Sequence, residues 1–177
     1  HSLNILLEAV DASIRDTNEV VTAMSHGDFG KRVVADFKGD LLTLKDGVNS
    51  SAAAMQISIT EVSTVLHAIA QGNFEKSIDI ELEGELKSLK SGVNDTAMAI
   101  GTAINSLSLM LEAMSQGNFK YRVTQDLQGE YDALAQSGDK AINAMDTALT
   151  EIDLVMANVA QGDLEARVSA TLPGQLN

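Results

Sequence analysis

One short phrase returns four times in this chain at a constant interval, and it constrains the fold more than any other feature. Each copy has a glycine followed by Asp or Asn and then by Phe or Leu; the glycines are Gly27, Gly72, Gly117 and Gly162. Successive glycines are 45 residues apart, without insertion or deletion. A fixed period of this size is typical of an array of similar units, each of which needs its neighbours to complete a hydrophobic core.

The composition favours helices and excludes several classes of partner. Hydrophobic residues make up 45% of the chain but aromatic residues only 3%, with no Trp and a single Pro. A net charge of −13 argues against binding to nucleic acid or to anionic lipid, both of which require Lys/Arg clusters. There is no cysteine for a disulfide. No run of about 18 apolar residues is present, so we expect no membrane insertion and a cytoplasmic location.

Between the glycines, apolar and small residues recur at spacings of three and four, the pattern of a coiled-coil seam. Each repeat also contains one extra spacing of four, a stutter, at Met55–Ile59, Ile100–Ile104 and Met145–Leu149. We therefore predict helices of about 31 residues with two halves joined at the stutter. The predicted seam core is Leu44, Val48, Met55, Ile59, Leu89, Val93, Ile100, Ile104, Leu134, Gly138, Met145 and Leu149.

Each helix is followed by a patterned connector of about 14 residues. Its first glycine is expected to cap the preceding helix in a left-handed conformation, and its last glycine precedes the next helix. The eight connector glycines are Gly27, Gly39, Gly72, Gly84, Gly117, Gly129, Gly162 and Gly174. Apolar residues at steps of four are predicted to anchor each connector on the helices: Phe29, Val33, Phe74, Ile78, Phe119, Val123, Leu164 and Val168.

The connector length predicts parallel helices. Antiparallel neighbours are usually joined by about 2–8 residues, fewer than each connector contains. An extended connector reaches about 40 Å, whereas a half-helix is only about 24 Å long, so the chain can run back and start the next helix parallel to the last. Two such helices cannot surround a core. We therefore predict an all-α fold in which a parallel homodimer forms tandem four-helix bundles.

The order of helix, Gly-Asp/Asn-Phe/Leu, a basic residue before an apolar anchor (Arg32-Val33, Arg122-Val123, Arg167-Val168) and a helix containing Val-Asn resembles the HAMP domain family. The phrases Val48-Asn49 and Asp126–Tyr131 look most like tandem HAMP regions of methyl-accepting chemotaxis receptors. The resemblance divides the chain into the end of a preceding helix (1–7), three units (8–56, 57–101, 102–146) and a truncated fourth (147–177).

The resemblance implies an intramolecular signal relay of a chemoreceptor, in which a bundle with two packings passes a bias from a covalently linked sensor to an output domain. No nucleophile motif, metal-ligand cluster or phosphate-binding loop is recognised, so we predict no catalytic residue, cofactor or metal and no enzymatic activity. His67 lacks an acidic neighbour in the sequence and is interpreted as a surface residue. Two alternatives remain: the dimerisation or linker region of a sensor histidine kinase, and a static scaffold of antiparallel helices.

Gly138 breaks the pattern of the third unit. It occupies the seam position that Val48 and Val93 hold in the other units, in the middle of a predicted helix. Glycine there costs about 1 kcal/mol of helix propensity relative to alanine. Two interpretations are open: tolerated sequence drift, or a third unit that is a weaker and more dynamic link.

Overall fold

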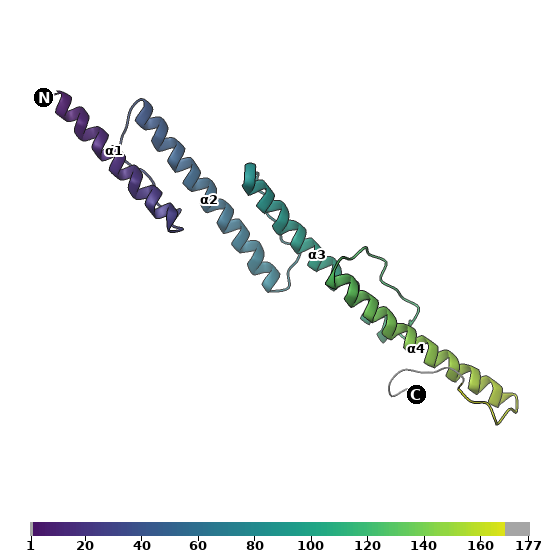
Figure 1. The fold of residues 1–177 in the computed structure, drawn as a ribbon. Coiled ribbons are helices and arrows are strands. Elements are labelled where there is room, and N and C mark those ends of the chain that lie inside the picture. Colours follow the sequence, from purple (N-terminus) through teal and green to yellow (C-terminus); the bar gives the residue numbers. More distant parts are fainter. Residues whose placement is uncertain (1, 169–177) are drawn as a thin grey trace. The chain divides into compact units, whose positions relative to one another are not determined.

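The computed structural model describes residues 2–168, which form four α-helices and no strand. The helices are α1 (Ser2–Ser25), α2 (Asp40–Ala70), α3 (Gly84–Ser115) and α4 (Glu130–Ala160), as shown in Figure 1. The all-helical prediction is confirmed. The predicted helix length also holds, because α2 and α4 have 31 residues and α3 has 32. One predicted connector glycine, Gly174, lies outside the described residues.

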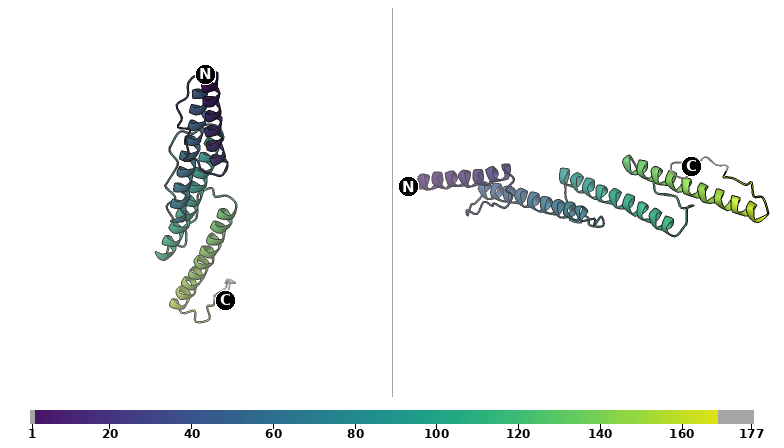
Figure 2. Two further views of the ribbon diagram at one scale, coloured as in Figure 1. Left: turned by 90° about the vertical axis from the view of Figure 1, so that its left-hand side faces the viewer. Right: turned by 90° about the horizontal axis from the view of Figure 1, so that it is seen from below.

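The chain divides into two compact parts, which we call the N-terminal body (His1–Asn94) and the C-terminal body (Asp95–Asn177). In the N-terminal body the connector after α1 returns along the helix pair, so that α2 starts beside α1 and runs in the same direction (Figures 1 and 2). Consecutive helices of this body are therefore parallel, as the connector length predicts, and not antiparallel hairpins.

The core of the N-terminal body lies under the first connector. Val20 of α1 and the connector residues Val33 and Phe37 are its buried centre. Four partly buried residues surround this centre: Met24, Ala35, Leu41 and Val48. The connector thus contributes two of the three central side chains, which explains why its apolar residues recur at fixed steps.

The helices bury a face made largely of small residues within the single chain. On α2 this face comprises Ala52, Ser58 and Val65, and on α4 it comprises Ala135, Ile142 and Ala148. The Ser58 hydroxyl donates to the Ala54 carbonyl oxygen at 2.7 Å, so this buried polar group is satisfied within its own helix. None of these residues belongs to the predicted seam, which therefore lies on a different face.

Two helices, α2 and α3, are long and apolar enough to cross a membrane by length and composition, with mean hydropathies of 1.2 and 1.3 in their most apolar windows. Within the single chain, 17% and 28% of these windows are buried. In α2 the Asn49 and Gln56 side chains bind the polar connector, and Gln56 accepts from the Arg32 guanidinium at 2.8 Å. A helix with such polar attachments fits an aqueous bundle better than a hydrocarbon environment.

Candidate functional site

The repeated glycine phrase forms a specific helix ending. Gly72 has a φ of 81°, and its N–H donates to the Ile69 carbonyl, while the next N–H, of Asn73, donates to the Ala68 carbonyl. These two bonds define a Schellman motif, which requires a residue in the left-handed conformation at the glycine position. The same pair of bonds follows the other three helices, at Gly27, Gly117 and Gly162.

The Asp or Asn after each glycine has its own role, which the sequence pattern did not reveal. The Asn73 Oδ1 atom accepts from the backbone N–H of Glu75 at 3.1 Å. The equivalent bond, from the N–H two residues on, is formed by Asp28, Asn118 and Asp163. Asp and Asn both accept a hydrogen bond through a short side chain and so form this Asx turn, which explains why either residue can occupy the position. The turn directs the chain out of the helix into the connector.

The middle of each of the first two connectors is held by an asparagine of the following helix. Asn49 Oδ1 accepts from the Val33 N–H at 2.8 Å, and Asn49 Nδ2 donates to the Val33 carbonyl at 2.9 Å. Asn94 binds Ile78 in the same way, at 2.9 and 3.1 Å. A carboxamide can satisfy both backbone groups because it carries a donor and an acceptor. We call Asn49 and Asn94 the connector-binding asparagines.

A lysine one turn before each connector-binding asparagine makes a second attachment. The Lys45 ammonium donates to the carbonyl of Ala35 at 2.8 Å and to that of Val34 at 3.3 Å. Lys90 donates to the Ile80 carbonyl at 2.8 Å. The repeated pairs Leu44-Lys45 and Leu89-Lys90 were visible in the sequence, but only the fold shows that the lysines reach the connector.

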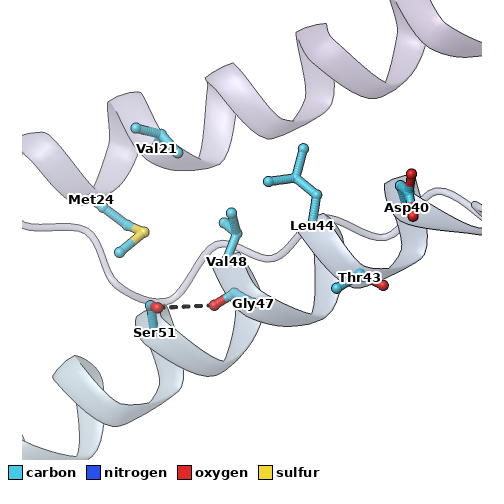
Figure 3. A pocket seen from close by; sticks show the side chains of 8 residues that line it. All are labelled: Val21, Met24, Asp40, Thr43, Leu44, Gly47, Val48 and Ser51. Atoms are coloured by element: carbon cyan, nitrogen blue, oxygen red, sulfur yellow. Dashed lines mark hydrogen bonds between the residues drawn. The ribbon is translucent and has the colours of Figure 1, made fainter.

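An open apolar groove of about 660 Å³ lies between α1 and α2 (Figure 3). Val21 and Met24 of α1 face Leu44 and Val48 of α2 across it. The Ser51 side chain also lines the groove, and its hydroxyl donates to the Gly47 carbonyl, so that its hydrogen is already engaged within α2. The groove lies on the predicted seam face.

Most of the predicted seam is solvent-exposed in the single chain. The exposed members are Leu44, Met55, Ile59, Leu89, Ile104, Leu134, Met145 and Leu149, with exposed fractions between 40% and 51%. Val48, Val93, Ile100 and Gly138 are half-buried. Because these side chains repeat with coiled-coil spacing but none is fully buried within one chain, they form a regular surface that no other part of the chain covers completely.

The predicted connector anchors differ among the repeats. Val33 and Ile78 are buried, at 2% and 1% exposure, whereas Val123 is only half-buried. The aromatic anchors Phe29, Phe74 and Phe119 are half-buried. In the last connector the corresponding residues Leu164 and Val168 are exposed, since no following helix packs against them in the part of the chain that the structure describes.

Gly138 does not leave an empty position in the C-terminal body. A Cβ added there would lie 2.7 Å from the Met110 Sδ atom, and closer still to its methyl group. Met110 is buried, at 5% exposure, and occupies the position that Val20 and Val65 hold in the first two repeats. The larger side chain on α3 thus fills the space that the glycine on α4 provides.

Lys31 and Glu19 form an ion pair on the surface of the N-terminal body. The Lys31 ammonium lies 2.9 Å from the Glu19 carboxylate. This hydrogen bond, together with the opposite charge, lowers the pKa of Glu19 and raises the pKa of Lys31 relative to their usual values. The contribution is lost as pH falls through the lowered pKa of Glu19 or rises through the raised pKa of Lys31. Both groups are exposed, so the pair adds little stability.

The metal-ligating residue types do not cluster in the described part of the chain. No group of three His, Cys, Asp or Glu side chains in residues 2–168 is placed to hold a metal ion. His67 lies on the exposed surface of α2, where a ring nitrogen is 3.1 Å from the Gln71 amide nitrogen. The features that repeat are the helix endings, the connector attachments and the exposed seam.

These repeated features agree with the comparisons with known proteins. Two family models, both described as HAMP domain, match the chain: one at residues 1–57 and 87–147, the other at 58–102. The searches of curated proteins and of solved structures gave no match. HAMP domains are signal-relay linkers of sensory signalling proteins and typically act as dimers. The matched segments together cover most of the chain, which therefore belongs to the HAMP domain family as a tandem array.

Proposed function

We propose that this chain is the cytoplasmic signal relay of a chemoreceptor and works as a parallel homodimer of stacked four-helix bundles, without enzymatic activity of its own. The observation that carries the proposal is the exposed seam. Leu89, Ile104 and Leu134 are each about half exposed, at 45%, 48% and 51%, although they stand at core positions of a coiled-coil pattern.

A second copy of the chain is the partner best suited to bury this exposed seam. Exposed apolar rows of this length are unusual on a monomer and indicate an interaction surface. The seam repeats with the same period as the helices, so a parallel copy in register places equivalent residues opposite each other along the whole array. In the first unit such a copy would close the groove between Val21, Met24, Leu44 and Val48.

A signal relay requires that the helix bundle can adopt two packings of similar free energy. The stutters are positions at which these two packings can differ. The seam changes its heptad frame at Met55–Ile59, Ile100–Ile104 and Met145–Leu149. Each stutter lies in an unbroken helix that belongs to two successive units. A rotation or tilt selected in one bundle would therefore pass along the shared helix into the next bundle.

The chemoreceptor context rests on the phrases Val48-Asn49 and Asp126–Tyr131. The kinase alternative receives less support, because His67 has a glutamine and not a carboxylate as its side-chain partner. A phosphorylated His67 recovered after incubation with ATP and the ATP-binding catalytic domain of a histidine kinase would favour that alternative.

Disulfide crosslinking tests the parallel dimer directly. The chain has no native cysteine, so a single Leu89→Cys substitution reports on one seam position alone. We expect rapid formation of a same-residue disulfide dimer under mild oxidation, because equivalent seam residues face each other in a parallel bundle. The measurement is the rate of dimer formation on a non-reducing gel.

The matched control is Ser91→Cys. Ser91 is exposed on the same helix, about 200° away from Leu89 around the helix axis. Its disulfide dimer should form much more slowly. Equal rates for the two variants, or no dimer with Leu89→Cys, would rule out the parallel seam.

A further inference from the structure

We propose that the third connector, 116–129, separates from α4 more readily than the first two connectors separate from their helices, and that Asp139 and Ala135 are the residues responsible. This inference goes beyond the relay function, since it concerns the attachment of a connector within one chain. It rests on three differences between the third unit and the first two.

The first difference is the loss of the connector-binding asparagine. Asp139 stands at the position of Asn49 and Asn94. A carboxylate accepts hydrogen bonds but cannot donate one to a backbone carbonyl as a carboxamide does. The Asp139 Oδ1 atom is buried and has no hydrogen-bond partner among the described residues. The Val123 N–H, which corresponds to the bonded N–H groups of Val33 and Ile78, likewise finds no acceptor in the described chain.

The second difference is the loss of the lysine. Ala135 stands where Lys45 and Lys90 donate to connector carbonyls. It is buried, at 5% exposure, and offers no side-chain donor. Two neighbouring turns of α4 have therefore both lost the group that binds the connector in the earlier units.

The third difference is the looser burial of the connector itself. Val123 is half-buried, in contrast to Val33 and Ile78, which are almost fully buried. Two attachments of connector side chains remain: the Arg122 guanidinium donates to Asn143 of α4, and Ser106 of α3 donates to Gln125 at 3.1 Å. The Arg122 bond has a counterpart between Arg32 and Gln56 in the first unit, so it does not replace the lost asparagine and lysine.

Amide hydrogen exchange on the full 177-residue chain, resolved by NMR, tests the proposal at three equivalent N–H groups. We expect the protection factors of the Val33 and Ile78 amides to be about two- to tenfold higher than that of the Val123 amide, the effect expected of one net hydrogen bond. Asp139→Asn should slow exchange at Val123 by a similar factor, and adding Ala135→Lys should slow it further. Val123 protection equal to that of Ile78 in the native chain would overturn the proposal.

Two further variants separate the attachment from effects of charge or folding. Asp153→Asn makes the same charge change at an exposed position of α4 away from the connector and should leave Val123 exchange unchanged. Asn94→Ala removes both the acceptor and the donor of this attachment and should speed exchange at Ile78 towards the Val123 rate while α3 stays helical by circular dichroism. An Ile78 amide that remains protected in Asn94→Ala would show that the asparagine does not hold the connector, even if Asp139→Asn failed to fold.

Discussion

At the scale of single residues, the structure changes the meaning of Gly138. In the sequence it removes a seam side chain from the third unit, which is open to two interpretations, tolerated drift or a weaker and more dynamic link. In the structure Met110 of α3 fills that space, whereas the first unit places Val20 and Val48 in one cluster. Where the first unit has two valines, Val20 and Val48, the third unit thus has a methionine, Met110, and a glycine, Gly138. Met110 leaves no void at Gly138, and the weakness that we propose for the third unit lies in its connector attachment.

This exchange predicts strong coupling between positions 110 and 138. Gly138→Val should destabilise the chain by about 1–3 kcal/mol because the new side chain overlaps Met110. Met110→Val alone should also destabilise it, because it leaves a cavity. The double variant restores the valine pair of the other repeats and should recover most of the stability. Urea unfolding of the four proteins gives the coupling energy, and additive effects would contradict the compensation.

At the scale of elements, the helix endings and lengths could be read from the sequence to within a residue. The phrase Gly-Asp/Asn-Phe/Leu marks each C-terminus, because the left-handed position favours glycine over residues with a Cβ and the Asx turn needs a short acceptor. The single discrepancy is that α3 begins at Gly84 itself and not after it. Such differences are within the usual uncertainty of helix ends.

The helix ending after α2 predicts a measurable cost for losing its glycine. Gly72→Ala should lower the free energy of unfolding by about 1–2 kcal/mol per chain, because alanine is strained at a φ of 81°. The cost is conformational, since space for a Cβ is available there. Gln71→Ala changes the preceding residue, whose φ of −92° suits any side chain, and should have little effect. Equal stability losses in the two variants, measured by urea unfolding, would argue against a strained cap.

At the scale of the whole molecule, the exposed seam is the dominant feature. Many large apolar side chains of α2, α3 and α4 remain near half exposure, while small residues such as Ala52 and Ala148 are buried within the chain. The single chain therefore leaves many of its large apolar side chains exposed, although some, such as Ile78 and Ile142, are buried within it. This distribution is expected of a protomer whose core is completed by association.

Association of this kind makes thermal stability depend on protein concentration. We expect the Tm to rise as the chain concentration is increased, because the dimer is favoured by mass action. Leu89→Glu places a charge on the seam and should lower the Tm and weaken the concentration dependence. Ser91→Glu, on the exposed side of the same helix, should leave both nearly unchanged. A native Tm independent of concentration over a hundredfold range, with a monomeric mass in solution, would contradict the homodimer.

The sequence by itself determined the period, the four helices, the connectors and the positions of the glycines, because these depend on local backbone preferences and on the spacing of apolar residues. It also marked the seam, since the 3-4 spacing is a property of one helix. Only the tertiary structure decided which side chains meet across the connector and between helices. Asn49 reaches Val33 and Met110 fills the space at Gly138 because of how the connector and helices are rotated against each other. That rotation is set by packing and hydrogen bonds between distant residues, which helical periodicity does not specify.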